Sequence, residues 1–395
     1  MVFCVPFKQP AVLRARFRSL FTFNFVTVGD IMKKIFLYAY DKINFGDDLF
    51  IRTIANRYPN VKFYLWSKKY NKKTFWNIKN LKVVAQDSKK LDLLVQIHPS
   101  LFSRYKSHLE RKCDAVVYIG GSIFIEYENW KQILTWWEWE ATNRNFYVLG
   151  ANFGPYKTDA YREKSAEIFS DVTDICFRDK YSLKLFSDVK SVRYAPDILL
   201  GYEFSSIVPK KQVFISVIDC TVRNSVMDRI SDKEELYLDL LTCYIKEYSK
   251  NGYDIILSSF CKAENDEINV EKLLNIVKEH KITTNISVKN YNGSNFDKIL
   301  LSINESEVII ASRFHAAILG FAAKRAVIPV VYSDKTINVL NDMGFKGKYF
   351  DIRKMNPSDI YDVYIPDNKD QSLENIDSLC SRSEKHFEKL DQLLR

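Results

Sequence analysis

The sequence lacks any long hydrophobic run. No stretch approaches the ~20 consecutive apolar residues that a helix needs to span a bilayer, so the pattern excludes an integral membrane protein. We also find no clustered stripe of lysine and arginine with interleaved aromatic residues, which is the pattern typical of nucleic-acid binding. Nucleic acid is therefore not an expected partner.

Cysteine and histidine are few and scattered. The seven cysteines are odd in number and mostly lie inside apolar runs such as Asp174-Ile175-Cys176-Phe177, which predicts reduced packing residues. No Cys-x-x-Cys pair or Cys/His cluster has the spacing of a metal site, and the five histidines are dispersed along the chain. We therefore expect a cytoplasmic protein that uses neither a metal nor another cofactor.

The sequence does contain enough apolar residues for a large core. Of its 395 residues 47% are hydrophobic, which excludes disordered and fibrous classes, and the length predicts two domains. The formal net charge is +9, an excess that suits an anionic small substrate or an anionic membrane surface.

Residues 1–31 differ from the rest of the chain. They are basic and aromatic, with four basic residues against one acidic residue. The regular pattern of the remaining chain begins at Met32-Lys33-Lys34. Two explanations stay open. We favour a disordered leader or an upstream start-site artefact over a basic presequence for membrane attachment, because Pro6 and Pro10 interrupt the segment and no clean cleavage site follows.

From Lys33 onward, short apolar runs alternate with longer amphipathic ones, which is typical of β-α units around a parallel sheet. The stretch Tyr202–Lys211 is rich in Ser, Pro and Lys and reads as a linker, after which the pattern restarts. The sequence therefore predicts an α/β protein with two Rossmann-like, doubly wound domains facing a cleft. Their expected bounds are 32–201 and 212–370, with a linker at 202–211 and an amphipathic C-terminal helix within 371–395.

The most informative segment is Val308–Ile318, where an apolar strand becomes a helix through Ser312-Arg313-Phe314-His315. Free N–H groups at a helix start favour an anion, Arg313 adds a planar cationic fork, and His315 can exchange a proton near neutral pH. The alternative is structural: Arg313 caps a surface, and His315 is a core histidine with its hydrogen bonds satisfied.

A second segment, Asn44-Phe45-Gly46-Asp47-Asp48, follows the first predicted strand. Gly46 permits a close backbone approach, and Asp47 or Asp48 suits a helix start, so a capped turn is one reading. The other reading makes Asp47 a carboxylate in the cleft that orients or deprotonates a sugar hydroxyl.

Further polar residues stand where other predicted strands end. Gly120-Gly121 allows a ligand to touch main-chain N–H groups, although it is no dinucleotide-binding fingerprint. Asn152 and Arg178 follow two later strands, and Lys335 follows the strand after the Arg313 segment, where it can neutralise a phosphate. Four tryptophans could stack on sugar rings or simply pack a helix, namely Trp130, Trp136, Trp137 and Trp139.

The ordered set of these motifs, from roughly Lys33 to Gly344, resembles the polysaccharide pyruvyl transferase family. The resemblance rests on Asn44-x-Gly46-Asp47, Gly120-Gly121, Gly154-Pro155, Arg178-Asp179-x-x-Ser182, Ala195-Pro196-Asp197, Ser312-Arg313-Phe314-His315-Ala316 and Tyr332-x-x-Lys335. Two positions depart from the family pattern: Ser122 stands where a third glycine is common, and Glu307 where Asp is common.

The resemblance implies a fold like that of two-domain GT-B glycosyltransferases and transfer of pyruvate from phosphoenolpyruvate to a sugar as a ketal. His315 and Asp47 are then the expected acid and base. The expected substrate-binding residues are Arg313, Arg178, Lys335, Asn44, Gly46, Gly120, Gly121, Asn152, Ser312 and Phe314.

By the same resemblance, the acceptor is a hexose in a surface polysaccharide precursor, lipid-linked in one version of the hypothesis, and peripheral contact with the inner face of the membrane fits the positive charge. Two other functions remain open at this point. One is a GT-B glycosyltransferase that uses a nucleotide sugar, and the other is a non-catalytic binding protein of glycan biosynthesis.

Overall fold

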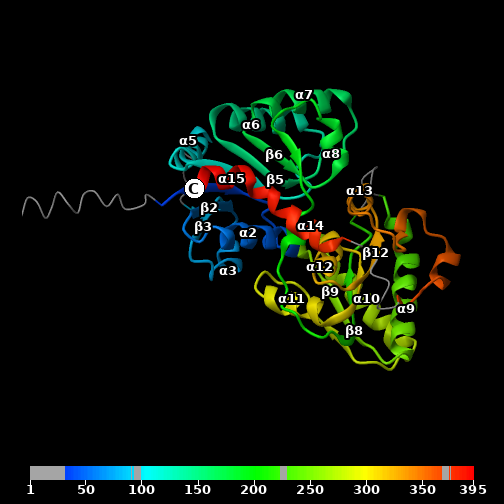
Figure 1. Ribbon diagram of the computed structural model, residues 1–395. Coiled ribbons are helices and arrows are strands. Elements are labelled where there is room, and N and C mark those ends of the chain that lie inside the picture. The colour runs from blue at the N-terminus through cyan, green and yellow to red at the C-terminus, as the bar shows by residue number, and fades with distance from the viewer. Residues whose placement is uncertain (1–31, 90, 93–98, 223–228, 367–372, 374) are drawn as a thin grey trace, which may run out of the picture.

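The computed structural model describes residues 32–89, 91–92, 99–222, 229–366, 373 and 375–395. The predicted leader, residues 1–31, lies outside these ranges. The described chain forms two parallel β-sheets with helices on both faces of each sheet (Figure 1), which confirms the predicted fold class. No helix in the described part of the chain is long and apolar enough to cross a membrane.

The first sheet has the strand order β3-β2-β1-β4-β5-β6-β7. Its strands are β1 (Lys34–Tyr38), β2 (Lys62–Ser67), β3 (Leu81–Ala85), β4 (Ala115–Ile119), β5 (Phe146–Ala151), β6 (Asp174–Phe177) and β7 (Val192–Tyr194). The helices of this half are α2 (Phe45–Arg57), α3 (Asn71–Thr74), α5 (Pro99–Glu110), α6 (Trp130–Asn143), α7 (Asp159–Asp171), α8 (Lys180–Leu185) and the 3-10 turn η1 (Ile198–Gly201).

The second sheet has the order β10-β9-β8-β11-β12-β13. Its strands are β8 (Lys210–Val217), β9 (Asp254–Ser259), β10 (Ile286–Val288), β11 (Ser306–Ala311), β12 (Ala326–Val331) and β13 (Phe350–Asp351). Its helices are α9 (Glu234–Lys250), α10 (Asp266–Glu279), α11 (Phe296–Glu305), α12 (Phe314–Ala322) and α13 (Asp334–Met343), with 3-10 turns η2 (Ser231–Lys233), η3 (Lys262–Glu264), η4 (Ile352–Lys354) and η5 (Pro357–Tyr361).

Strand order reverses between β1 and β4 in the first sheet and between β8 and β11 in the second. Ligands of doubly wound folds bind outside the carboxyl ends of the strands at such switch points. The segments that follow β1, β4 and β11 carry Asp47, Gly121 and His315, so the topology brings the predicted motifs to these places.

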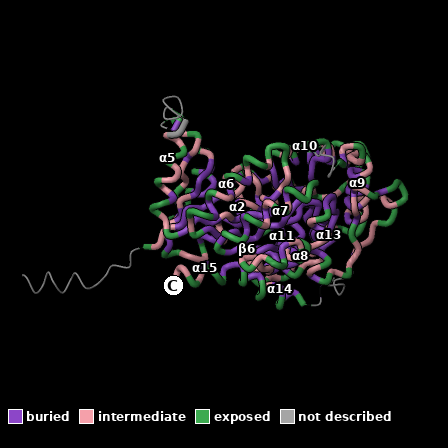
Figure 2. Tube along the Cα trace, turned by 90° about the horizontal axis from the view of Figure 1, so that it is seen from above, coloured by how far each residue is buried: buried purple, intermediate pink, exposed green. Residues whose placement is uncertain are grey.

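The two halves share one hydrophobic core. Phe45, at the start of α2, packs its ring 4.6 Å from that of Phe260, and its backbone N–H donates to the Phe260 carbonyl at 2.9 Å. The buried carboxylate of Asp48 accepts a hydrogen bond from the Tyr291 hydroxyl at 2.8 Å. One cluster of buried residues spans both halves, and buried positions continue through the centre of the molecule (Figure 2).

The C-terminal segment is broken where a single helix was expected. It consists of α14 (Ile376–Ser383), the 3-10 turn η6 (Glu384–Phe387) and α15 (Glu388–Leu394), and it returns to the first half of the chain. Arg193 donates to the carbonyls of Lys385 and His386, and the buried His386 ring lies 2.9 Å from the Pro196 carbonyl. These contacts draw the backbone out of a straight helix.

Three other element boundaries differ from the expected ones. The strand β8 begins at Lys210, inside the predicted linker. The helix expected to start at an aspartate begins at Phe45, with the Asn44 side chain accepting from the Gly46 N–H. The amphipathic pattern of residues 264–279 predicts a helix from Glu264, but α10 begins at Asp266, because Glu264 belongs to the 3-10 turn η3.

Candidate active site

A cleft of about 1370 Å³ lies between the carboxyl ends of the two sheets. Its volume exceeds the ~300–1,000 Å³ of an ordinary small-molecule site, so it has room for a donor and part of a larger acceptor. The predicted site residues that line it are Asn44, Asp47, Gly121, Asn152, Arg178, Arg313, Phe314, His315 and Lys335.

Three predicted site residues do not line this cleft. Gly46 and Gly120 are buried behind it. Ser312 is also buried, and its hydroxyl accepts a hydrogen bond from Tyr237 at 2.8 Å, which ties the end of β11 to helix α9. These three residues support the site from behind.

Arg178 follows β6 and connects both halves. Its guanidinium donates to Asp197 at 3.2 Å and to the Asn152 side-chain oxygen at 2.7 Å, both within the first half. It also lies 4.2 Å above the ring of Phe314, from the second half, and its Nη1 is 3.5 Å from Nε2 of His315. Arg178 is 2% exposed, so these contacts are made out of bulk water.

His315 stands in the first turn of α12, between protein cations and apolar rings. Its ring meets that of Phe50 edge-on, with the centroids 5.0 Å apart. Burial lowers the pKa of His315 well below its usual value, and the positive charges of Arg178 and Lys335 lower it further. Because an arginine can only donate, the Nε2 atom that faces it presents a lone pair, and these surroundings favour the neutral form of His315.

Asp47 has the opposite perturbation. Burial raises the pKa of this carboxyl to about 6, although the charges of Arg178 and Lys335 act to lower it. Near neutral pH the cleft therefore holds a neutral imidazole together with a carboxyl group that retains its proton in part of the molecules. Two groups whose pKa values are displaced in this way are suited to exchange protons with a bound substrate.

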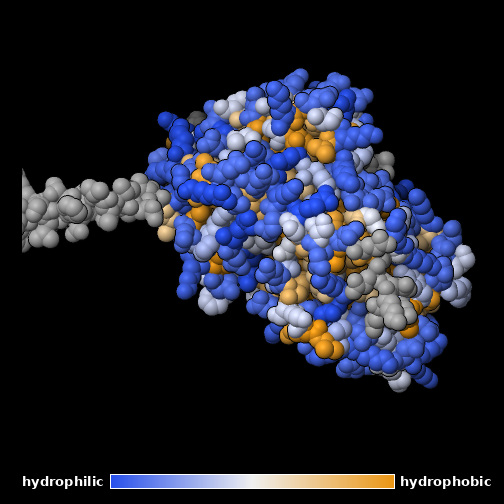
Figure 3. Space-filling view, viewed as in Figure 1, coloured by the Kyte–Doolittle hydropathy of each residue, from blue (hydrophilic) through white to orange (hydrophobic). Residues whose placement is uncertain are grey.

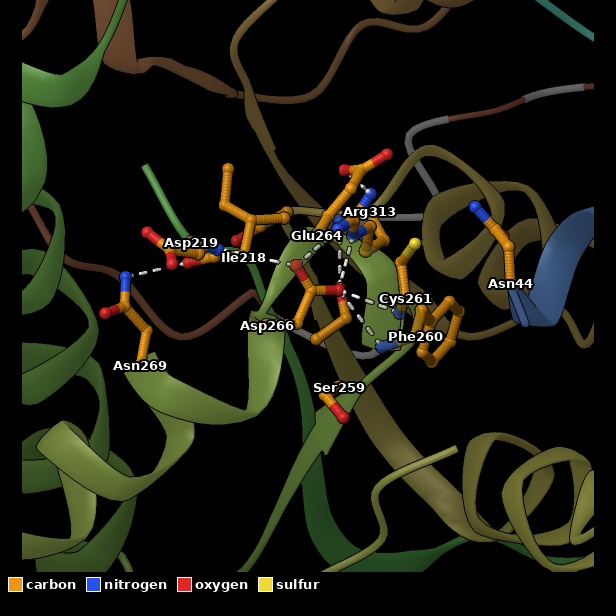
Figure 4. Close-up of polar contacts among 12 residues, drawn as sticks. Asn44, Ile218, Asp219, Ser259, Phe260, Cys261, Glu264, Asp266, Asn269 and Arg313 are labelled. Carbon is orange, nitrogen blue, oxygen red and sulfur yellow. Dashed lines mark hydrogen bonds and ion pairs between the residues drawn. The ribbon is translucent and has the colours of Figure 1, made fainter. Parts of the chain in front are cut away.

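Arg313 has partners that the sequence reading did not anticipate (Figure 4). Its guanidinium forms ion pairs with Glu264 at 2.7 Å and with Asp266, which holds it through two nitrogen atoms. Asp266 also accepts from the backbone N–H groups of Phe260 and Cys261. Arg313 lines the cleft, and its predicted contact with an anionic ligand stays a prediction, although two protein carboxylates already outnumber its single charge.

Lys335 lies in the first turn of α13 and reaches the first half, where its Nζ donates to the Ser122 hydroxyl at 3.3 Å. Among the described residues, no carboxylate lies within ion-pair distance of Lys335. Ser333 precedes this helix and is 6% exposed, and its hydroxyl has no hydrogen-bond partner in the described chain. This corner of the cleft thus offers a cation without an ion-pair partner among the described residues and a free hydroxyl at a helix N-terminus.

Two glycines are explained by neighbouring side chains. A Cβ atom at Gly46 would lie 1.7 Å from Nδ1 of His315, and one at Gly121 would lie 2.5 Å from Nη2 of Arg178. The sequence reading assigned both glycines to a close approach by a ligand. Both glycines leave room for the two side chains that face the cleft, and Gly121 also lines the cleft itself, so a ligand contact at Gly121 stays a prediction.

Glu264 and Asp266, which hold Arg313, escaped the sequence reading. Asp197, which holds Arg178, and Ser122, which accepts from Lys335, were named in the motif comparison but given no site role. Each follows a β-strand by a few residues, and acidic or hydroxyl side chains at strand ends were the available signal. No spacing rule paired them with particular cations, because the pairing is made in space.

The first-half wall of the cleft is aromatic. Of the four tryptophans in the 130–139 run, only Trp136 and Trp137 line the cleft, and Trp137 is buried in a stack on the Tyr118 ring, with the centroids 5.3 Å apart. Tyr127, which is 54% exposed, and Tyr156 complete this wall. Aromatic faces next to polar groups are suited to sugar rings.

The profile of the polysaccharide pyruvyl transferase family matches residues 44–334 of the sequence. The chain belongs to this family. The matched range begins at Asn44, contains Asp47, Arg178 and His315, and ends at the start of α13. No curated protein gives a significant match to the sequence.

Several solved structures of proteins with other names are similar in fold to this chain. UDP-GlcNAc 2-epimerase from Neisseria meningitidis, bound to UDP-GlcNAc, matches with a TM-score of 0.57 at 10% identity, covering 91% of this chain and 100% of that chain. The UDP-GlcNAc 2-epimerase from Methanocaldococcus jannaschii matches with a TM-score of 0.54 at 12% identity, covering 91% and 99%.

HepE from Anabaena, in complex with UDP and glucose, matches with a TM-score of 0.51 at 11% identity, covering 91% of this chain and 96% of that chain. At these identities the likeness concerns the fold alone, and it establishes a GT-B-like arrangement of two sheets around a cleft for this pyruvyl transferase family member.

Proposed function

We propose that this transferase moves pyruvate from phosphoenolpyruvate onto two hydroxyl groups of a sugar, forming a pyruvate ketal. One observation carries the proposal: Arg178 and Lys335 converge on the same cleft as a neutral His315 and an Asp47 whose pKa is raised to about 6. Phosphoenolpyruvate carries a carboxylate and a phosphate, so it needs convergent cations together with proton donors and acceptors.

The reaction balances with two protons. A proton adds to C3 of the enol and creates the methyl group, while the first sugar oxygen bonds to C2. The bond between C2 and the phosphate oxygen then breaks, and the second sugar oxygen bonds to C2 and closes the ketal. The two hydroxyl groups release one proton each: one replaces the proton used at C3, and the other leaves with inorganic phosphate.

The two titratable groups suggest how these protons move. Protonated Asp47 gives its proton to C3 and regains one from the second hydroxyl. Neutral His315 takes the proton of the first hydroxyl and passes it to the departing phosphate, whose negative charge favours the imidazolium. This assignment makes Asp47 the acid and His315 the first base, the reverse of the expectation from sequence.

The cationic residues bind the donor or support the cleft. We assign the donor's anionic groups to Arg178, Lys335 and the free N–H groups of α13, with the Ser333 hydroxyl as a further contact. Arg313 is assigned to holding the η3–α10 segment beside the cleft, because its charge is already matched by Glu264 and Asp266.

For the acceptor, we propose a sugar of a surface polysaccharide precursor that lies on the aromatic wall of Trp136, Tyr127 and Tyr156. The large volume of the cleft suits a sugar that is attached to a longer chain or a lipid carrier. We place the reaction in the cytoplasm, at the inner face of the membrane.

Thermal shift and mass spectrometry test this function together. We expect phosphoenolpyruvate to raise the melting temperature of the wild-type protein, because a ligand that binds the folded state stabilises it. We also expect the mass gain of a pyruvate ketal on one member of a panel of lipid-linked and nucleotide sugars, and no gain with the His315→Gln variant. Stabilisation by UDP- or GDP-sugars but not by phosphoenolpyruvate would instead indicate a glycosyltransferase. If none of these donors stabilises the protein, a non-catalytic binding role follows.

A further inference from the structure

We propose that residues 68–82, here called the lysine-rich edge, bind the anionic surface of a phospholipid bilayer. This segment links β2 to β3 and contains α3. It carries six lysines and no acidic residue, namely Lys68, Lys69, Lys72, Lys73, Lys79 and Lys82. The sequence reading, which found no clustered basic stripe, overlooked it.

The charge of the lysine-rich edge is not neutralised by the protein. Five of its six lysines are exposed, and among the described residues none of the six lies within ion-pair distance of a carboxylate. Lysines elsewhere on the surface do pair, for example Lys324 with Asp377 at 2.7 Å and Lys164 with Glu138 at 2.9 Å. An anionic surface would attract this segment, because its six lysine charges exceed that of the neighbouring Asp87, whose carboxylate accepts from the Lys69 backbone N–H at 2.7 Å.

Aromatic side chains project from the same segment. Trp76 is 79% exposed and Tyr70 is 42% exposed, while their neighbours Phe75 and Ile78 are buried in the core. An exposed tryptophan is costly in water but favourable at the level of lipid headgroups, where its amphipathic ring finds both apolar and polar surroundings. Lysines around an exposed tryptophan therefore indicate an interfacial contact.

The protein holds this segment in a fixed position. The Asn80 side chain donates to the carbonyls of Ala55 and Tyr58, both at 2.9 Å, and so fixes the segment to the end of α2. At the other end, Tyr70 and Asn71 donate to the carbonyl of Asp41, at 2.5 and 3.0 Å. Asp41 precedes Asn44, which lines the cleft, so the lysine-rich edge adjoins the β1–α2 loop. A bilayer on this edge would lie beside the cleft.

A membrane fits better than a nucleic acid. The cationic residues are all lysines, whereas arginine forks are the usual means of bidentate phosphate recognition in nucleic acids. None of them lines the cleft, and single-stranded nucleic acids are bound in basic grooves. Helix α3 lies at the periphery of the first half, beside α2, on a predominantly hydrophilic surface (Figures 1 and 3).

Vesicle co-sedimentation of the full chain tests the proposal. We expect the protein to bind vesicles of phosphatidylcholine mixed with phosphatidylglycerol, to bind pure phosphatidylcholine weakly, and to detach as salt is raised. The triple variant Lys72→Gln, Lys73→Gln and Lys79→Gln should lose on the order of a hundredfold in binding. A matched triple variant of exposed lysines in the second half, at Lys250, Lys278 and Lys281, should bind like the wild type.

Trp76→Ala should weaken binding by roughly tenfold, since an apolar ring that enters the headgroup layer is lost. Tyr361→Ala is the control, because Tyr361 is 81% exposed but belongs to the second half. Equal binding by the wild type and the triple variant, or no binding of the wild type to anionic vesicles, overturns the proposal. Tighter binding of a single-stranded oligonucleotide, lost in the same triple variant, also overturns it in favour of a nucleic acid.

The inference extends the proposed function, and it is tested independently of it. The vesicle assay contains neither phosphoenolpyruvate nor a sugar acceptor. Stabilisation of the triple variant by phosphoenolpyruvate should equal that of the wild type, since the lysine-rich edge lies outside the cleft. Failure of the donor assay with intact vesicle binding would therefore reject only the donor, and the reverse result would reject only the membrane contact.

Discussion

Two corners of the cleft are each formed by an arginine that follows a β-strand. The two corners differ in the number of carboxylates that pair with the arginine. Arg178 follows a strand of the first sheet, and Arg313 follows a strand of the second. Arg178 is held by one carboxylate, from Asp197, and by the neutral oxygen of Asn152. Arg313 is held by the carboxylates of both Glu264 and Asp266.

The difference shows that an arginine at a strand end does not by itself make an anion site. At the Arg313 corner, two carboxylates outweigh one guanidinium, so the local charge is negative. At the Arg178 corner, one carboxylate pairs with the guanidinium, and Lys335 adds a positive charge that has no ion-pair partner within the described residues. The remaining acidic group there is Asp47, whose raised pKa leaves it partly protonated near neutral pH. We expect the donor's phosphate and carboxylate to bind at the Arg178 corner.

The largest expected effect is a loss of catalytic rate when His315, which lies beside Arg178, is replaced. His315→Gln should lower kcat by about 10³- to 10⁴-fold, because it removes the proton acceptor from the cleft. Phosphoenolpyruvate should still raise the melting temperature of the variant, since Arg178 and Lys335 remain. Single-turnover release of phosphate measures the chemical step, and an unchanged rate would exclude His315 from catalysis.

Arg178→Ala and Arg313→Ala compare the two corners directly. Arg178→Ala should lower kcat/KM by about a thousandfold, because charged contacts to the donor are lost, and it should also lower stability, because the buried Asp197 loses its cation. Arg313→Ala should mainly lower stability, by about 3–5 kcal/mol, because two carboxylates are left without their cation. Urea unfolding and donor KM, each measured for both variants, separate the two effects. Similar losses of donor affinity per folded molecule in both variants would contradict the comparison.

Asp47→Asn tests the raised pKa of the acid. Because the acid must carry its proton, kcat/KM of the wild type should fall as pH rises through about 6, and the variant should lose this dependence together with about a hundredfold in rate. The folded protein holds this proton more tightly than the unfolded chain, so ionisation costs stability between about pH 4 and pH 6. The variant should therefore melt no lower than the wild type at pH 8. A lower melting temperature there would indicate a structural role.

The smallest expected effect comes from Gly46→Ala. Alanine normally favours a helix over glycine, but here the methyl group would collide with the His315 ring. We expect a loss of about tenfold in kcat as the imidazole is displaced. Alanine at Gly120 is the control, because the nearest atom to a Cβ there is 3.4 Å away. Equal activity of the two variants would mean that the ring moves without consequence.

Much of the fold was predictable because it depends on local pattern. Short β-branched apolar runs such as Val308–Ala311 favour buried strands, and their alternation with amphipathic segments predicts a parallel sheet. The broken C-terminal segment was not predictable. Its turn at Glu384–Phe387 results from the hydrogen bonds of Arg193, which is about 190 residues away in sequence and carries no local signal of this contact.

The site was predictable in position but not in charge. Strand ends located Asp47, Arg178, His315 and Lys335 in one cleft, since carboxyl ends of parallel strands meet at one edge. The partners of each cation depend on which side chains meet in space, so the pairing of Arg313 with Glu264 and Asp266 could not be read from spacing. The same limit applies to the pKa values, because burial is what lowers that of His315 and raises that of Asp47.

The shared core between the halves has a consequence for the cleft. Arg178 and His315 belong to different sheets, and they lie 3.5 Å apart. Their spacing therefore depends on the buried contacts that join the halves, such as those of Phe45 with Phe260 and of Asp48 with Tyr291. Close-packed interiors transmit strain, so a packing defect at these contacts would shift the two cleft residues relative to each other.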